Sequence, residues 1–194
     1  MKKALRLTSF FTVVSIPILV LAVVLLVFMY RLVVINSLEK QVESSNITVA
    51  NMLSNVIWEQ IRVLELSPEN KQSHMLNEIY ADVIDQDIYR YLHDTPILKV
   101  KVFNIEGKTV YSTEKKEIGV IKPKNYTGRK VVTRKIPISS ISHRDTFSSI
   151  QGELSGIEVL ATYIPKFSEN NEENSDPEYA GKVEGVFEII TDLT

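Results

Sequence analysis

Hydrophobic residues form one unbroken run near the start of the chain. Between Arg6 and Arg31, residues 7–30 include no charged side chain. A helix of that length is roughly 36 Å long at about 1.5 Å per residue, whereas the hydrocarbon core of a bilayer is ~30 Å thick. The pattern therefore predicts a transmembrane anchor at residues 7–35, preceded by a short cytoplasmic tail at residues 1–6.

A cleaved signal peptide is the alternative interpretation of this run. The apolar region of a signal peptide is about 7–15 residues long and ends at small residues, but here the run is longer and ends at Tyr30 and Arg31. We favour an uncleaved anchor. Basic residues precede the run and no acid does. This charge bias places the N-terminus in the cytoplasm and residues 36–194 outside it, in a single-pass protein of the plasma (inner) membrane.

A helical period follows the anchor. Neither proline nor glycine interrupts residues 36–66, and apolar side chains there recur on two stripes. One stripe is expected to cover a sheet and the other a second subunit, which predicts a homodimer through residues 36–66. Burial of both stripes inside one domain is the alternative. The stripes are Leu38, Val42, Val49, Met52, Val56 and Val63, and Leu53, Ile57, Ile61 and Leu64.

Ser67 and Pro68 interrupt this helix and suit the start of a second one, expected from about Pro68 to Leu92. Beyond Pro96, apolar and polar residues alternate as in strands. We predict an α+β domain in which residues 36–94 are helical and pack on a five-stranded, mainly antiparallel sheet within residues 97–194. The expected strands are 97–103, 108–112, 128–138, 157–166 and 181–192, with residues 139–142 as a connection and the acidic run 168–178 as an exposed loop.

Charge and composition exclude several classes of function. The formal net charge is −2; because residues 1–35 carry four bases and no acid, the rest of the chain carries −6. Such an acidic domain is a poor partner for nucleic acid. The chain has no cysteine, which excludes disulfides, thiolate zinc ligands and cysteine nucleophiles.

Three features suggest chemistry, and none of them is complete. His143-Arg144-Asp145 matches the start of a protein-kinase catalytic loop, but Ile150 stands where that loop has its magnesium-binding asparagine. We therefore expect Arg144 and Asp145 to be structural, pairing with strand ends or backbone groups. The three histidines lack metal-ligand spacing, and the acidic run lacks the pattern of a calcium loop. We expect no metal, no cofactor and no enzymatic activity in this chain.

Arginine, tyrosine and hydroxyl side chains in the sheet region are candidates for lining a ligand pocket. Arginine suits carboxylates and phosphates, and tyrosine suits amphipathic small molecules. Arg134 and Tyr163 are expected on neighbouring strands, which favours a carboxylate-bearing ligand over an amine; a solvent-facing Arg134 is the alternative. The candidate ligand-binding residues are Tyr111, Ser112, Arg129, Thr133, Arg134, Arg144 and Tyr163.

Five segments of the sheet region have a familiar pattern: Val100–Thr113, Glu117–Gly119, His143–Phe147, Thr162–Pro165 and Gly185–Thr194. Together they resemble the extracytoplasmic PAS-like or Cache-like sensor domains of bacterial membrane signalling proteins. In that family the domain precedes a diguanylate cyclase or a two-component histidine kinase module, and its closing strand runs into a second membrane span. The resemblance implies that this chain is either the N-terminal part of a longer two-span sensor or a truncated, anchored module.

Two functions follow as hypotheses. The first is a membrane-anchored extracytoplasmic sensory domain that binds a small ligand or partner for transmembrane signal transduction. The second is a membrane-anchored extracytoplasmic interaction or assembly protein with no small-molecule ligand. A second apolar span followed by an enzyme domain beyond Thr194 would favour the first.

Overall fold

The structure is a computed structural model that describes residues 2–66, 71–168 and 181–194, and it divides the chain into two compact units, Met1–Gln41 and Val42–Thr194. The expected helix start at Ser67 and Pro68 and nearly all of the acidic run lie outside the described residues. The elements are α1 (Lys2–Leu66), α2 (Lys71–Leu92), β1 (Ile97–Asn104), β2 (Thr109–Ser112), η1 (Lys115–Glu117), α3 (Thr127–Arg134), β3 (Ile138–Ser149), β4 (Gly152–Phe167) and β5 (Val183–Asp192).

The described part of the first unit is helical and belongs to α1. The window Val13–Arg31 has a mean hydropathy of 2.9, and none of its residues is buried. By length and composition, this helix meets the requirement for crossing a membrane, as the sequence predicts.

The second unit contains a five-stranded sheet in the order β2-β1-β5-β4-β3, with antiparallel pairing throughout. The last strand of the chain, β5, lies in the centre, between β1 and β4. Together with the helices, this sheet confirms the predicted α+β class. Four of the five predicted strands overlap observed ones, and the order is not a simple meander because β5 returns to pair with β1.

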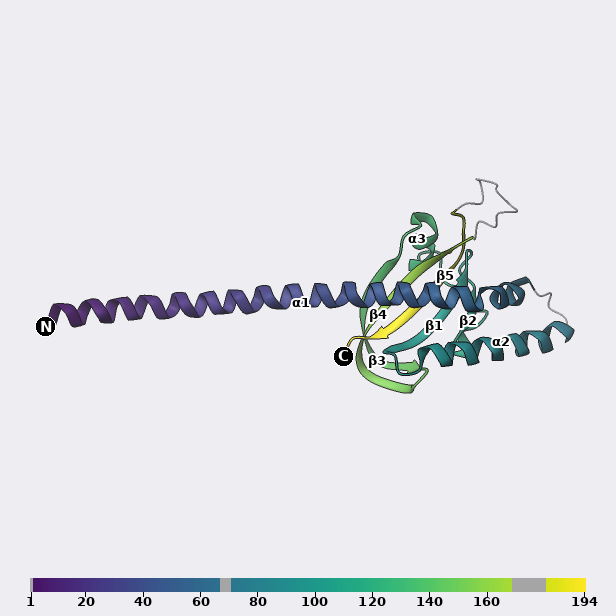
Figure 1. Ribbon diagram of the computed structural model, residues 1–194, viewed down its shortest axis with the longest axis horizontal. Helices are drawn as coiled ribbons and strands as arrows, with labels where there is room; N and C mark the ends of the chain where they lie inside the picture. Colours follow the sequence, from purple (N-terminus) through teal and green to yellow (C-terminus); the bar gives the residue numbers. More distant parts are fainter. Residues whose placement is uncertain (1, 67–70, 169–180) are drawn as a thin grey trace. The chain divides into compact units, whose positions relative to one another are not determined.

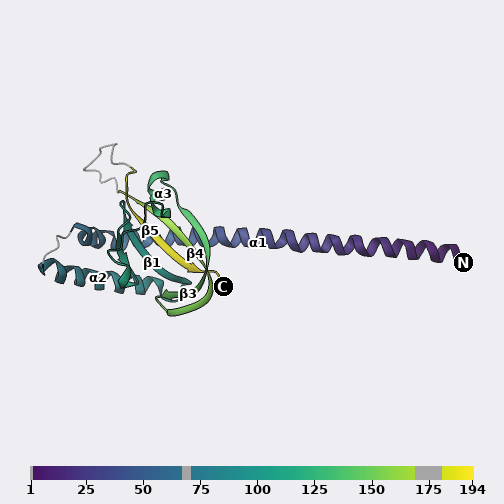
Figure 2. The ribbon, with the colours of Figure 1, turned by 180° about the vertical axis from the view of Figure 1, so that it is seen from behind.

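Within the second unit, the C-terminal part of α1 and the helix α2 cover one face of the sheet (Figures 1 and 2). Leu53, Ile57 and Ile61 are at most 1% exposed and form one apolar cluster with residues of α2 and the sheet, including Phe187. The second apolar stripe of the long helix therefore packs on the sheet, as expected. On the first stripe, Met52 remains 39% exposed, so the domain does not bury that stripe completely.

Buried hydrogen bonds fix the position of α1 on the sheet. Asn46, which is 1% exposed, donates from Nδ2 to Thr162 Oγ1 of β4 at 3.0 Å and accepts from Thr191 Oγ1 of β5 at 2.7 Å. Further along the helix, Trp58 Nε1 donates to Glu184 Oε2 at 3.0 Å. Because buried polar groups are costly when unpaired, these bonds select one register of the helix.

The predicted third strand, 128–138, is wrong. Residues 127–134 form α3, whose Val131 is fully buried against Phe103 and Val186 on the other face of the sheet. The helix ends at Lys135, which adopts the left-handed conformation (φ 58°) and donates its N–H to the Val131 carbonyl.

The expected connection at residues 139–142 belongs instead to β3, which pairs with β4 from one end of β3 to the other. The hairpin between them turns at Gly152, where φ is 117°, a conformation that favours glycine. The Ser149 hydroxyl stabilises this turn, accepting from Gln151 N and donating to the Gly152 carbonyl. The resulting strands are longer than predicted.

Candidate functional site

A row of polar side chains crosses the sheet on the face opposite α1 and α2. Strand pairing places Ser112 of β2 beside Lys101 of β1, Lys101 beside Glu188 of β5, and Glu188 beside Tyr163 of β4. The Tyr163 hydroxyl donates to Glu188 Oε1 at 2.6 Å, and Lys101 Nζ lies 3.5 Å from Glu188 Oε2. The side chains of Lys101 and Glu188 are only 8% and 7% exposed, so this is a buried ionic row.

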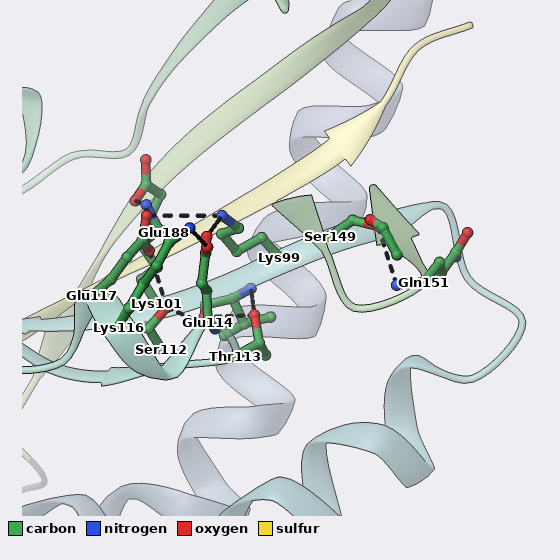
Figure 3. Close-up of polar contacts among 12 residues, drawn as sticks. Lys99, Lys101, Ser112, Thr113, Glu114, Lys116, Glu117, Ser149, Gln151 and Glu188 are labelled. Atoms are coloured by element: carbon green, nitrogen blue, oxygen red, sulfur yellow. Dashed lines mark hydrogen bonds and ion pairs between the residues drawn. The ribbon is translucent and has the colours of Figure 1, made fainter. Parts of the chain in front are cut away.

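A second buried lysine lies two residues along the same strand. The Lys99 side chain is 5% exposed; its ammonium pairs with Glu114 and lies 3.8 Å from Glu117 Oε1. Glu114 also pairs with Lys116, whose side chain is 77% exposed. Figure 3 shows these side chains converging from β1, β5 and the segment that includes η1.

Glu117 connects the two lysines. Its carboxylate lies 2.9 Å from Lys101 Nζ and accepts a hydrogen bond of 3.1 Å from the Ser112 hydroxyl. Burial raises the pKa of Glu117, but the hydrogen bond from Lys101 and the charges of both lysines outweigh it, so the net shift is downward. Glu117 is therefore expected to be charged near neutral pH.

Neighbouring lysines also lower the pKa of Glu114. Hydrogen bonds from the Lys116 and Lys99 ammonium groups lower the pKa of its carboxyl from 4.5 to about 2. At the other end of the row, burial, followed by the charge of Glu188 and the hydrogen bond to it, raises the pKa of Tyr163. Tyr163 is therefore a neutral hydrogen-bond donor.

The row forms one wall of an open cleft of about 540 Å³. Glu114 and η1 border it on one side and the β3–β4 hairpin on the other. The hairpin brings the Phe147 ring to 4.6 Å from Lys99 Nζ, and its tip is joined to β1 by a hydrogen bond from Ile150 N to the Leu98 carbonyl. The cleft thus combines ionic groups with an aromatic wall, a combination typical of small-molecule sites.

The cleft lining carries five cations and four carboxylates, because Lys122 and Glu153 also line it. The three carboxylates of Glu114, Glu117 and Glu188 are balanced by Lys99, Lys101 and Lys116. Arg144 of β3, an exposed side chain in the cleft lining, has no carboxylate partner among the described residues. An arginine in this position can bind a carboxylate or phosphate through two parallel hydrogen bonds.

The structure brings two of the predicted site residues, Arg144 and Tyr163, into the cleft lining. Ser112 lies beneath it and holds Glu117. Tyr111 faces the helices instead, where its hydroxyl donates to Asp85 Oδ1 at 2.6 Å. The other three candidates lie on α3 and do not line the cleft: Arg129, Thr133 and Arg134.

Arg134 and Tyr163 are therefore not on neighbouring strands, as the sequence had suggested. Arg134 is an exposed residue in the last turn of α3, outside the cleft lining. The physical reason is that burial of Val131 fixes this segment as a helix.

The expected Arg144–Asp145 structural pairing also differs. Both side chains are exposed on β3, and that of Asp145 is 99% exposed. Asp145 Oδ1 lies 3.6 Å from His143 Nε2, a surface contact worth little. Among the residues that the structure describes, no group of three or more His, Asp or Glu side chains is arranged to hold a metal ion.

Sequence reasoning missed the lysines and glutamates of the cleft. The sequence predicted an alternating strand at 97–103 and did not single out Lys99 or Lys101, yet both faces of this strand are buried. The missing information was strand pairing: β5 places Glu188 directly beside Lys101. The signal is an acidic residue in the closing strand, Glu188, opposite Lys101, and it becomes visible only when the pairing of the two strands is known.

Comparisons with known proteins add little to this geometry. No protein-family model matches the chain, and no curated protein matches it. Among solved structures, the PAS-B domain of Drosophila melanogaster Cycle, in a variant with bound glycerol, aligns with 50% of this chain and 100% of its own. The sequence identity is 10% and the TM-score is 0.28, values too low for a functional argument.

Proposed function

We propose that this chain is a sensory module, anchored in the plasma membrane by residues 7–35, whose PAS-like or Cache-like domain binds a small ligand outside the cytoplasm. The cleft over Lys99 and Lys101 is the proposed ligand site. The sequence resemblance supports the sensory class and the two-span arrangement of a diguanylate cyclase or histidine kinase sensor. The α+β architecture, with helices on one face of an antiparallel sheet, fits that class.

The observation that carries the proposal is a buried ionic network open to a cleft. Two lysines and Glu188 are more than nine-tenths buried. Such pairs add little net stability, because desolvation offsets their attraction and apolar residues can often replace them. Their position at the wall of a cavity of about 540 Å³, rather than in a closed core, favours a binding role over a structural one.

A homodimer through α1 belongs to the same proposal. Met52 of α1 is 39% exposed and Val42 is half-buried, and Ile79 of α2 is 51% exposed. Apolar surface of this kind is typical of helix-to-helix contacts between subunits.

The test uses the full chain in detergent micelles. Thermal unfolding is followed by circular dichroism in the presence of small acids, amines and osmolytes. A ligand at 100 times its Kd stabilises the folded state by about 2.7 kcal/mol and raises the melting temperature. The variant Arg144→Ala should weaken that effect, whereas Arg134→Ala, an exposed arginine outside the cleft, is the matched control.

Two outcomes contradict the proposal. If no compound in the panel raises the melting temperature, the assembly hypothesis without a small-molecule ligand is preferred. If a compound does so equally in Arg144→Ala and Arg134→Ala, and also in Tyr163→Phe, its site is not this cleft.

A further inference from the structure

We infer that the cleft binds a small organic acid, and that in the ligand-free chain the carboxylate of Glu114 occupies the position of the ligand's carboxylate on Lys99. This inference rests on the proposed function and specifies both the class of ligand and an exchange at the site. Glu114 then acts as an internal competitor for the ligand.

The lysine side of this contact is fixed. Lys99 and Lys101 lie on β1, which pairs with strands on both sides, and their side chains are 5% and 8% exposed. Successive side chains of a strand point to opposite faces, so these two ammonium groups share one face at neighbouring positions. A buried ammonium group requires an anionic partner, whether that partner comes from the chain or from a ligand.

The glutamate side of the contact lies outside the sheet. Glu114 follows the end of β2 and precedes η1. Besides Lys99, its carboxylate binds Lys116, an exposed side chain that can follow it into solvent. Glu114 is thus the one acid of the network held partly by a solvent-exposed partner among the described contacts, whereas Glu188 lies within β5 and Glu117 is held by Lys101 and Ser112.

The charge balance decides the sign of the ligand. When Glu114 and Lys116 move away together, the lining keeps four cations, Lys99, Lys101, Lys122 and Arg144, and three carboxylates, Glu117, Glu153 and Glu188. Four positive charges then face three negative ones, and one carboxylate restores neutrality. The aromatic ring of Phe147 and the side chain of Ile190, both in the lining, supply an apolar surface for a short carbon chain.

An amine is disfavoured by the same contacts. To reach Glu117 or Glu188, a cation would have to displace Lys101, whose backbone is fixed in the central part of the sheet. A displaced lysine at this position would be left buried without a partner, which is strongly unfavourable. Displacement of Glu114 by the carboxylate of a ligand therefore costs less free energy than displacement of Lys101 by a cationic ligand.

Substitutions of Glu114 and Lys99, the two partners of one ion pair, should change the affinity for acids in opposite directions. Binding of acetate, propionate and succinate to the full chain in micelles is measured by isothermal titration calorimetry, with putrescine as the cationic probe. Glu114→Gln removes the competitor and should tighten binding of at least one acid by threefold or more. Lys99→Gln removes the ligand's partner and should weaken it by tenfold or more.

Matched controls are the same changes at exposed positions outside the cleft, Glu106→Gln and Lys130→Gln, which should leave the affinities unchanged. If Lys99→Gln does not fold, Arg144→Ala replaces it, because that side chain is exposed and its loss should also weaken acid binding.

Each contrary result has a distinct meaning. Unchanged or weaker acid binding by Glu114→Gln shows that Glu114 is not a competitor and overturns the inference, while the cleft remains a ligand site. Binding of putrescine but of no acid also overturns it and leaves the proposed function intact. Absence of any ligand for the chain overturns both.

Discussion

Asn46 is the residue whose replacement tests the structure most directly, because it is the buried polar contact between α1 and the two strands β4 and β5. In Asn46→Ala, Thr162 keeps a partner, since its hydroxyl oxygen lies 3.1 Å from Ser139 Oγ. Thr191, 2% exposed, loses the acceptor of its hydroxyl. One unsatisfied buried hydroxyl, with the small cavity left by the amide, should cost about 2–4 kcal/mol.

The free energy of unfolding is measured from urea titrations followed by the fluorescence of Trp58, the one tryptophan of the chain. The control is Thr48→Ala on the same helix, an exposed residue whose hydroxyl bonds to the Ser44 carbonyl; it should change stability by less than about 0.5 kcal/mol. Adding Thr191→Val to Asn46→Ala removes the orphaned hydroxyl and should recover about 1 kcal/mol. Equal effects of Asn46→Ala and Thr48→Ala would refute this packing of α1.

Three further predictions concern other parts of the second unit. In Gly185→Ala, the added Cβ would lie 2.5 Å from Trp58 and 2.9 Å from a backbone oxygen, so urea unfolding should show a loss of about 1–3 kcal/mol; wild-type stability would contradict the tight contact. Because the pKa of Glu114 is lowered from 4.5 to about 2, its contribution to stability is complete above about pH 4.5 and is lost as the pH falls towards 2. In Glu114→Gln, the free energy of unfolding from urea titrations should therefore fall less steeply than in the wild type over this pH range. An identical fall in both proteins would contradict the lowered pKa of Glu114. Val42→Lys combined with Met52→Lys should convert a dimer into monomers in sedimentation experiments in detergent, and a wild-type monomer at high concentration would refute the dimer.

The spacing of apolar residues along the sequence was enough to predict part of α1 and the strand β1. The stripe Leu53, Ile57 and Ile61 packs on one face of the sheet, so a 3.6-residue period was a sufficient signal. The strand at 97–103 was also recognisable, because apolar and polar residues alternate there and a turn follows at Gly107, where φ is 91°. Each of these elements depends mainly on local pattern.

The helix α3 could not be found in this way. Its β-branched residues, Val131, Val132 and Thr133, favour strands in isolation, and eight residues are too few for a helix to be stable alone. It forms because Val131 packs against Phe103 and Val186 on strands distant in sequence. Tertiary contacts therefore override local preference at this segment.

The composition of the candidate site also depends on which strands pair in the sheet. The sequence predicted Arg144 and Tyr163 from side-chain chemistry alone, and both line the cleft. The choice of Arg134 was wrong in its placement, because it relied on an alternation that α3 does not follow. The buried Lys101 and Glu188 become neighbours only through the β1–β5 register, which no single-sequence pattern specifies.

The segment around η1 has contacts on both faces of the domain, and this gives the cleft a physical route to the helices. On the cleft side, Glu114 pairs with Lys99. On the helix side, the next residue, Lys115, pairs with Asp85 of α2, and the same Asp85 accepts the hydrogen bond of Tyr111. Because Glu114 and Lys115 are adjacent, we expect that a ligand which released Glu114 would also shift the backbone that holds Lys115. We therefore expect ligand binding to alter the contact between η1 and α2 while the row of Lys101 and its partners stays in place.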